Sequence, residues 1–257
     1  MVRQIGIFGL EGLPMIEEGD DLAELIVAAA KRNGVDIEHG DVLIVAQKVV
    51  SKAEGRTINL NNVEPSRRAV ELSKRTGRDS KLVELVLRES KRFLKASQQI
   101  IIVEDRRDIV NINAGIDKSN VEGMNNYTLL PEDPDESAKC LRSRIKEQTG
   151  KKVGVIISDS YSRAFRRGQV NFAIGLAGVD PFIDYRGKQD LFGYVLQVKF
   201  SAVADELAGA AELVMGQGRE GVPVAIVRGL NHVDASTEFS SKDLIISGEE
   251  DLFRSVR

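Results

Sequence analysis

The sequence is short of the residues on which several chemistries depend. Its 257 residues include one cysteine, Cys140, two histidines, His39 and His232, and no tryptophan. A single cysteine excludes an intrachain disulfide, and we interpret Cys140 as a packed small residue of a helix rather than as a nucleophile. Because the two histidines are far apart in the sequence, any metal site would rely on oxygen ligands, which favours Mg²⁺, Mn²⁺ or Ca²⁺ over zinc.

An excess of one charge and long apolar runs are also missing. The chain has 36 basic and 39 acidic residues and only 5% aromatic residues, so its composition argues against a nucleic-acid partner. No apolar run approaches the roughly 18 residues that a membrane span needs, and the apolar stretch before Glu11 is too short for a signal peptide. We expect a cytoplasmic protein whose residues 1–257 form one unit. An arrangement of two closely packed subdomains is the alternative, but the sequence does not show where their boundary would lie.

What is present is an alternation of strand and helix patterns. Apolar β-branched runs predict strands at 5–10, 42–46, 99–103, 109–112, 153–157, 195–203 and 222–227. Helical spacing and cap signals predict helices at 22–31, 66–75, 80–95 and 204–214, and a further helix that follows Asp133-Pro134-Asp135 and ends at Gln148. Residues 178–190 are expected to form a loop, and the tail from 236 to 257 is expected to be polar and partly helical.

One stretch, from Val153 to Phe172, combines acidic and basic residues beside a buried strand. The predicted strand ends at Ile157 and is followed by Ser158-Asp159-Ser160 and then by Arg163, Arg166 and Arg167. An acid flanked by hydroxyls next to arginines can hold a cation and an anion side by side, as a metal-bound phosphate requires. A strand end followed by a solvated turn explains the same residues, and both interpretations stay open.

Two further polar segments also follow predicted strands. Asp117 lies in the loop NAGIDKSN, where a short acid suits either a metal ion or an Asx-turn. Asp117 and Asp159 would converge at one sheet edge, where two carboxylates and phosphate oxygens can bind Mg²⁺ or Mn²⁺. Gln47, Lys48, Ser51 and Lys52 come after the strand at 42–46 and either neutralise a triphosphate or form a charged surface loop.

The glycines Gly216, Gly218 and Gly221 match the G-x-G-x-x-G pattern. A dinucleotide-binding fold needs a strand before this loop and a helix after it, whereas here the predicted helix comes first. This order disfavours a dehydrogenase. The glycines either let the backbone approach a phosphate or form an ordinary turn from helix to strand. The sequence contains no P-loop motif.

Five segments, taken in order, resemble the coenzyme F420-0:L-glutamate ligases, the γ-glutamyl ligases of F420 biosynthesis. They are EGLP at 11–14, QKVVSKAEGR at 47–56, NAGIDKSN at 113–120, SDSYSRAFRRGQVNFAIG at 158–175, and DELAGAAELVMGQGREGVPVAIVRGL at 205–230. The resemblance covers nearly the whole chain up to Asn231, and the tail beyond it carries little signal.

The resemblance implies GTP-dependent ligation of L-glutamate to coenzyme F420-0 through an acyl phosphate, with a second cycle on the γ-carboxylate of the glutamate just added. It implies two divalent ions, Mn²⁺ or Mg²⁺, and a monovalent K⁺. The implied fold is α+β, with mixed or antiparallel sheets, packed helices and an intertwined homodimer. Two alternatives are retained. One is a ligase of the same family that acts on a different acceptor, and the other is a regulatory homologue that binds nucleotide without catalysis.

Residue by residue, the resemblance implies a nucleotide site, a metal site and catalytic residues. Its nucleotide contacts fall on Glu11, Gly12, Leu13, Pro14, Gln47, Lys48, Lys52, Asn120, Met215, Gly216, Gln217, Gly218, Arg219, Glu220, Gly221 and Val222. Its metal ligands fall on Asp117 and Asp159 for one ion, and on Ser160, where threonine is more usual, and Gln217 for the other. Asp117, Asp159 and Lys52 are the expected catalytic residues. We hypothesise that Arg166 and Arg167 hold substrate phosphate or carboxylate groups.

Overall fold

A computed structural model describes residues 4–162, 165–230, 239–247 and 249–251. Its strands are β1 (Gly6–Gly9), β2 (Val42–Ala46), β3 (Thr57–Asn59), β4 (Ser90–Ser97), β5 (Ile100–Asp105), β6 (Val110–Ile112), β7 (Asn126–Thr128), β8 (Gly154–Ser162), β9 (Gln169–Ala177), β10 (Phe182–Asp184), β11 (Phe200–Ala202) and β12 (Val224–Arg228). Its α-helices are α1 (Leu22–Arg32), α2 (Gln47–Ala53), α3 (Arg67–Thr76), α4 (Ser80–Arg88), α5 (Pro134–Thr149) and α6 (Val203–Met215), and its 3₁₀ turns are η1 (Leu60–Asn62), η2 (Asn113–Gly115) and η3 (Ser241–Leu244).

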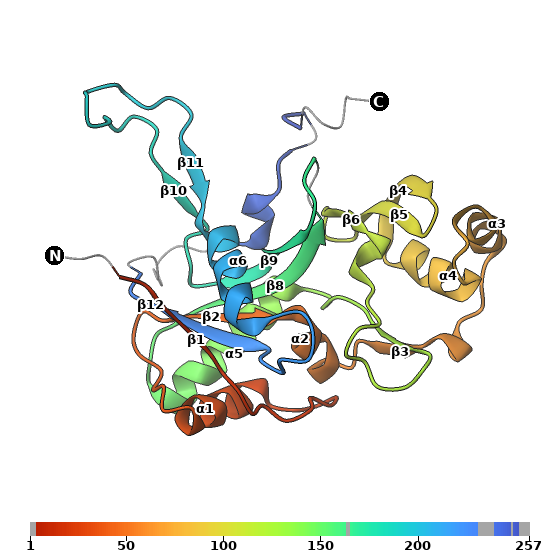
Figure 1. Cartoon of the computed structure of the whole chain (residues 1–257), viewed down its shortest axis with the longest axis horizontal. Coiled ribbons are helices and arrows are strands. Elements are labelled where there is room, and N and C mark those ends of the chain that lie inside the picture. Colours follow the sequence, from red (N-terminus) through yellow and green to blue (C-terminus); the bar gives the residue numbers. More distant parts are fainter. Residues whose placement is uncertain (1–3, 163–164, 231–238, 248, 252–257) are drawn as a thin grey trace.

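A five-stranded sheet in the order β1-β12-β2-β8-β9 forms the centre of the molecule. Only β2 and β8 are parallel, and the other neighbours are antiparallel. Because side chains alternate along a strand, Leu43 and Val45 pack on the side of α1 and α5, while Val42 and Ile44 pack on the side of α6 (Figure 1). This mixed sheet with helices on both faces confirms the predicted α+β class.

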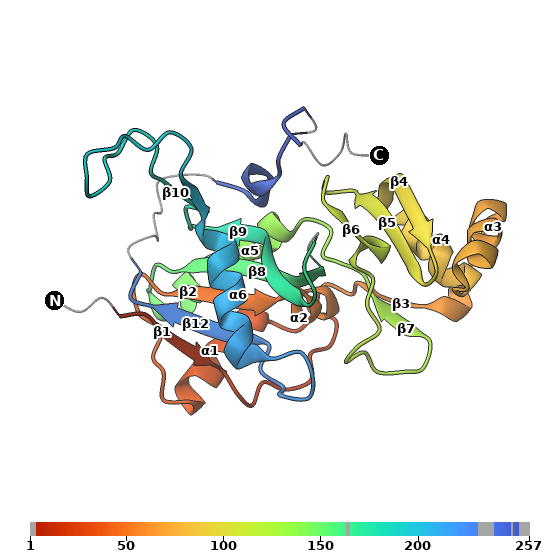
Figure 2. The same cartoon turned by 45° about the horizontal axis from the view of Figure 1, so that its top comes forward.

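The segment from β3 to β7 builds a smaller layer beside the main sheet, with cores of its own. The three-stranded sheet β4-β5-β6 packs on α3 and α4 through Leu72, Val83, Val86 and Ile101. Figure 2 shows this layer standing apart from the five-stranded sheet. Asp117 follows η2 and forms an isolated bridge with Thr128 of β7. The loop that carries Asp117 therefore belongs to the smaller layer.

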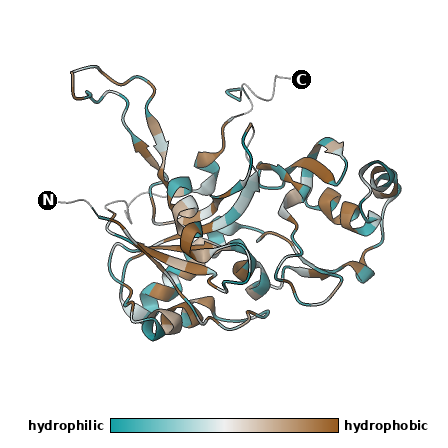
Figure 3. Ribbon diagram, in the orientation of Figure 1, coloured by the Kyte–Doolittle hydropathy of each residue, from teal (hydrophilic) through white to brown (hydrophobic). Residues whose placement is uncertain are grey.

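Strands β10 and β11 form the base of a long arm that projects from the body (Figure 1). Its tip carries Leu191, 98% exposed, and Phe192, 95% exposed, and Val198 nearer the base is 87% exposed. Figure 3 shows hydrophobic colour at the tip as well as on the two strands. The strand predicted at 195–203 is regular only over β11, and β10 lies within the segment predicted as loop, because pairing occurs mainly at the arm's base.

The helix predicted at 80–95 was wrong in its second half. Helix α4 ends at Arg88, and Ser90–Ser97 pairs with β5 as the antiparallel strand β4. Gln99 adopts a positive φ of 63° in the tight turn between the two strands. Pairing with an apolar neighbouring strand outweighs the weak helical propensity of this segment, and Phe93 packs onto the core of the smaller layer from the strand instead.

The prediction that the strand beginning at Val153 ends at Ile157 was also wrong. Strand β8 continues to Ser162, because β9 pairs with it along this whole length, opposite Asp159 and Ser160. On its other side β8 pairs with β2 only as far as Ser158, where β2 ends at Ala46. Asp159 and Ser160 therefore lie on an overhang of the sheet and not in a turn.

Three smaller expectations also need correction or fall outside the described residues. Cys140 is exposed on α5 and not packed. In the described part of the tail, regular structure is limited to η3. Arg163 and His232 lie outside the described residues. Across the part of the chain that the structure describes, no helix is both long and apolar enough to cross a membrane.

Candidate active site

A cavity of about 1190 Å³ opens where the overhang of β8, helix α2, the Asp117 loop and the glycine loop after α6 meet. It brings together most of the residues expected at the site: Leu13, Pro14, Gln47, Lys48, Lys52, Asp117, Asn120, Asp159, Ser160 and the loop from Met215 to Val222. Glu11 and Gly12 precede the lining residue Leu13 but do not belong to the lining. Asp117 and Asp159 converge as predicted, although from two different layers and not at one sheet edge.

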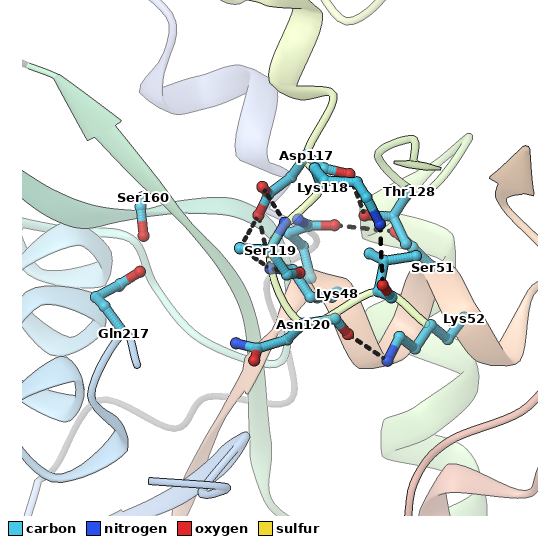
Figure 4. A network of polar contacts seen from close by, with 12 residues as sticks. Lys48, Ser51, Lys52, Asp117, Lys118, Ser119, Asn120, Thr128, Ser160 and Gln217 are labelled. Atoms are coloured by element: carbon cyan, nitrogen blue, oxygen red, sulfur yellow. Dashed lines mark hydrogen bonds and ion pairs between the residues drawn. The ribbon is translucent and has the colours of Figure 1, made fainter. Parts of the chain in front are cut away.

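Helix α2 begins directly after β2, where the sequence suggested either basic residues at a strand end or a surface loop. Lys48 and Lys52 lie four residues apart and therefore share one face of the helix. The ammonium of Lys48 donates to Oδ2 of Asp117 at 2.6 Å and to the backbone oxygen of Ser119 at 2.6 Å. Lys52 donates to the backbone oxygen of Asn120 at 2.8 Å (Figure 4). Both ammonium groups thus lie at the cavity wall.

The electrostatics of this wall keep Asp117 ionised. Burial raises the pKa of Asp117, but hydrogen bonds from Lys48 and from Ser119 outweigh this effect and leave the pKa below its usual value. Burial, and next the neighbouring Lys48, lower the pKa of Lys52. The sequence did not single out Ser119, which donates its hydroxyl to Oδ2 of Asp117 at 2.6 Å. Its position two residues after Asp117 was the available signal.

The pKa of Asp159, on the overhang of β8, is shifted in the opposite direction from that of Asp117. Burial raises its pKa to about 7, and the negative charge of Asp117 adds to the effect, while a backbone hydrogen bond from Ser160 opposes it. Asp159 therefore holds its charge weakly at neutral pH. A cation bound between the two carboxylates would favour the ionised form of Asp159.

The glycine loop follows α6 and precedes β12, so the order helix, loop, strand is as predicted and differs from a dinucleotide-binding fold. Gly216 ends the helix with φ 69° and ψ 177°, a conformation that is essentially restricted to glycine. The backbone N–H of Gly218 donates to a carboxylate oxygen of Glu220 at 2.7 Å. A backbone N–H in this loop is thus already oriented toward an anion, as phosphate binding requires.

Ser160 and Gln217, the residues expected to serve the second ion, point toward one another across the cavity from the Asp117 cluster (Figure 4). Both donate to Oδ1 of Asn171, Ser160 at 2.9 Å and Gln217 at 3.2 Å. The sequence reasoning missed Asn171. An asparagine within the apolar strand pattern QVNFAIGLA was the available signal, and the side chain is buried.

Of the arginine cluster, the described residues Arg166 and Arg167 do not line the cavity. Arg166 and Arg167 are exposed in the connection between β8 and β9. Ser162 and Gln169, which flank this connection, do line the cavity. The two arginines therefore lie in a hairpin connection whose flanking residues belong to the rim of the cavity.

The donor atoms fit a hard divalent cation that is completed by substrate oxygens. Among the described residues, no group of three or more His, Cys, Asp or Glu side chains could hold a metal ion. Mg²⁺ is usually held by one or two carboxylates together with phosphate oxygens, and the cavity supplies two carboxylates, a hydroxyl and an amide. Asp117 and Asp159 line the same cavity, so their carboxylate oxygens are both available to such an ion.

Comparison with known proteins places the chain in a family. The family model for F420-0:gamma-glutamyl ligase matches residues 12–229. A protein of Methanothermobacter thermautotrophicus named coenzyme F420:L-glutamate ligase is 44% identical over 251 residues, covering 97% of this chain and 99% of that protein. A protein of the same name from Archaeoglobus fulgidus is 47% identical over 251 residues, covering 98% and 97%. The chain belongs to the F420-0:gamma-glutamyl ligase family.

Proposed function

We propose that the protein is a GTP-dependent ligase that adds L-glutamate to coenzyme F420-0, and then γ-linked glutamate to the product. The observation that carries the proposal is the convergence of Asp117, Asp159, two lysines and the glycine loop on one cavity. The names of the relatives in Methanothermobacter and Archaeoglobus support the substrates. The use of GTP rests on the family resemblance, and a cytoplasmic location is proposed from the composition of the chain.

In the proposed reaction a carboxylate oxygen of the acceptor attacks the γ-phosphorus of GTP, and the bond from that phosphorus to the bridging oxygen of GDP breaks. The amine of L-glutamate then attacks the acyl phosphate, loses a proton and expels phosphate, which leaves the amide. Phosphoryl transfer needs mainly positioning and neutralisation of charge. Lys48 and Lys52 would supply positive charge beside the phosphates, and the backbone of the glycine loop would supply N–H donors.

Two divalent cations, Mn²⁺ or Mg²⁺, belong to the proposal. Asp117 and Asp159 would hold one, and Ser160 and Gln217 would hold the other. When bound, the cations neutralise phosphate charge and orient the γ-phosphoryl group. A requirement for K⁺ is proposed from the family resemblance and is tested by comparing turnover in potassium and sodium salts. Arg166 and Arg167, at the rim, are proposed to bind the acceptor's acidic groups and not GTP.

The test is mass spectrometry of F420-0 incubated with the protein, GTP, Mn²⁺ and L-glutamate. We expect a mass gain of one or more glutamyl units and GDP release that requires both F420-0 and glutamate. Asp159→Asn should abolish the mass gain, whereas Asp36→Asn, the same change at an exposed site outside the cavity, should not. No mass gain with Mn²⁺ or Mg²⁺ would overturn the proposal. GTP binding without turnover would instead support a regulatory homologue.

We also propose that the protein is a homodimer in which the arm contributes to the interface. The apolar tip, with Leu191 and Phe192 almost fully exposed, supports this, because exposed apolar patches commonly mark association sites. Light scattering after size exclusion should give twice the chain mass of 28.2 kDa. Phe192→Asp should shift the distribution toward the monomer, and an unchanged dimer would remove the arm tip from the interface.

A further inference from the structure

Helix α6 lies along β9, which is an edge strand of the five-stranded sheet. Two acids of the helix accept hydrogen bonds from backbone N–H groups of this strand. Asp205 accepts from the N–H of Ala173 at 3.0 Å, and Glu212 accepts from the N–H of Asn171 at 3.1 Å. Both acids thus satisfy donors that an edge strand leaves unpaired. For Asp205, the structure gives this contact alone.

Glu212 makes a second contact that Asp205 lacks. Its other carboxylate oxygen, Oε1, accepts from Nε2 of Gln217 at 2.7 Å. Nε2 of Gln217 also donates to Oδ1 of Asn171 at 3.2 Å. A side-chain amide has two N–H donors, so Glu212 and Asn171 together engage both. The carbonyl oxygen of Gln217 is consequently directed away from these acceptors and toward Ser160 (Figure 4).

The same asparagine orients Ser160. The hydroxyl of Ser160 donates to Oδ1 of Asn171 at 2.9 Å. Since a hydroxyl has a single proton, this bond leaves the lone pairs of Ser160 available to the cavity. Asn171 therefore accepts from both residues at one atom and leaves two oxygens, one amide and one hydroxyl, presented side by side.

We propose that Glu212 and Asn171 are positioning residues that hold the oxygens of Gln217 and Ser160 toward the second divalent cation. This inference rests on the proposed function, because that function supplies the cation. A hard cation is bound by oxygen and is repelled by an amide NH₂ group. Without Glu212, the amide of Gln217 is free to turn its nitrogen toward the cation. Partners that orient ligands in this way typically contribute 10- to 100-fold to metal affinity.

The experiment counts bound Mn²⁺ by electron paramagnetic resonance in the presence of GDP. We expect two Mn²⁺ per wild-type chain. In Glu212→Ala and Asn171→Ala the affinity for the second Mn²⁺ should fall at least about tenfold. Asn171→Asp should retain both ions, because an aspartate oxygen still accepts from Ser160 and Gln217. Asp205→Ala is the matched control: it removes a bond from α6 to β9 without freeing Gln217, and it should bind two ions.

A second measurement needs no metal. The side-chain ¹⁵N–¹H signals of Gln217, assigned by their loss in Gln217→Glu, should shift in Glu212→Ala and stay in place in Asp205→Ala. Two Mn²⁺ at wild-type affinity in both Glu212→Ala and Asn171→Ala would overturn the inference alone. If the wild-type chain binds only one Mn²⁺, both this inference and the two-cation proposal are overturned. Failure of the inference alone is therefore distinguishable from failure of the proposed function.

Discussion

Asp159→Asn is expected to stabilise the metal-free protein at alkaline pH while it abolishes turnover. Burial, with a contribution from the charge of Asp117, raises the pKa of Asp159 from 3.8 to about 7. Between these two values the folded chain binds more protons at this site than the unfolded chain. The free energy of unfolding therefore falls as the pH rises through this window. An amide at position 159 carries no charge at any pH in this range and removes the penalty.

The magnitude follows from the size of the shift. A pKa difference of one corresponds to about 1.4 kcal/mol. The rise from 3.8 to about 7 therefore limits the change in the free energy of unfolding to roughly 4 kcal/mol. Asp159 is only partly buried and faces a cavity that admits water, and Lys48 offsets part of its charge. We therefore expect Asp159→Asn to gain on the order of 2 kcal/mol over the wild type between pH 5 and pH 8.

The assay is urea unfolding in EDTA at pH 5 and pH 8, for the wild type, Asp159→Asn and the control Asp36→Asn. Comparing the pH dependence of the three proteins cancels the other titrating groups. Added Mn²⁺ should stabilise the wild type at pH 8 and have a smaller effect on Asp159→Asn, because the variant has lost a cation ligand. Equal pH dependence in the wild type and Asp159→Asn would refute this account of the site.

Three further predictions concern the lysine, the rim and the fold. Lys48→Met should weaken GTP binding by about tenfold or more in calorimetry, since a charge-assisted hydrogen bond contributes about 1.5–3 kcal/mol; unchanged affinity would remove Lys48 from the nucleotide site. Arg166→Glu should raise KM for F420-0 and leave GTP affinity unchanged, and a variant with wild-type kinetics would contradict its role. Gly175→Ala should lower the stability by about 1–3 kcal/mol, because its Cβ would overlap the backbone of Pro134; an unchanged Tm would contradict that packing.

Several parts of the fold were predictable because they depend on local chemistry. Helix α1 begins after Asp21, whose side chain accepts from the N–H groups of Ala23 and Glu24, and helix α5 begins at Pro134, directly after its N-cap Asp133. The residues of strand β2 form a short, largely buried apolar run, which predicts a strand without reference to the rest of the chain. The order of helix, loop and strand around Gly216 was also predicted from the sequence, and it correctly disfavoured a dinucleotide-binding fold.

Other parts depended on partners far away in the sequence. Ser158 to Ser162 contains polar residues that usually end a strand, yet β9 supplies hydrogen bonds along its length. Ser90–Ser97 became a strand because β5 lies beside it, not because of its own pattern. The polar segment after β2 became helix α2, and only this helix brings Lys48 and Lys52 to the same wall of the cavity.

The sequence by itself determined the residue types of the site and the family to which the chain belongs. Asp117, Asp159, two lysines and three glycines were recognisable from their neighbours in the chain. Only the tertiary structure decided that Asp117 approaches from a separate layer and that Asp159 lies on an overhang of the sheet. It also decided that Gln217 donates to Glu212 and Asn171, and that Ser160 donates to Asn171. Burial and hydrogen bonds between distant segments set these features, and both depend on packing in three dimensions rather than on local sequence.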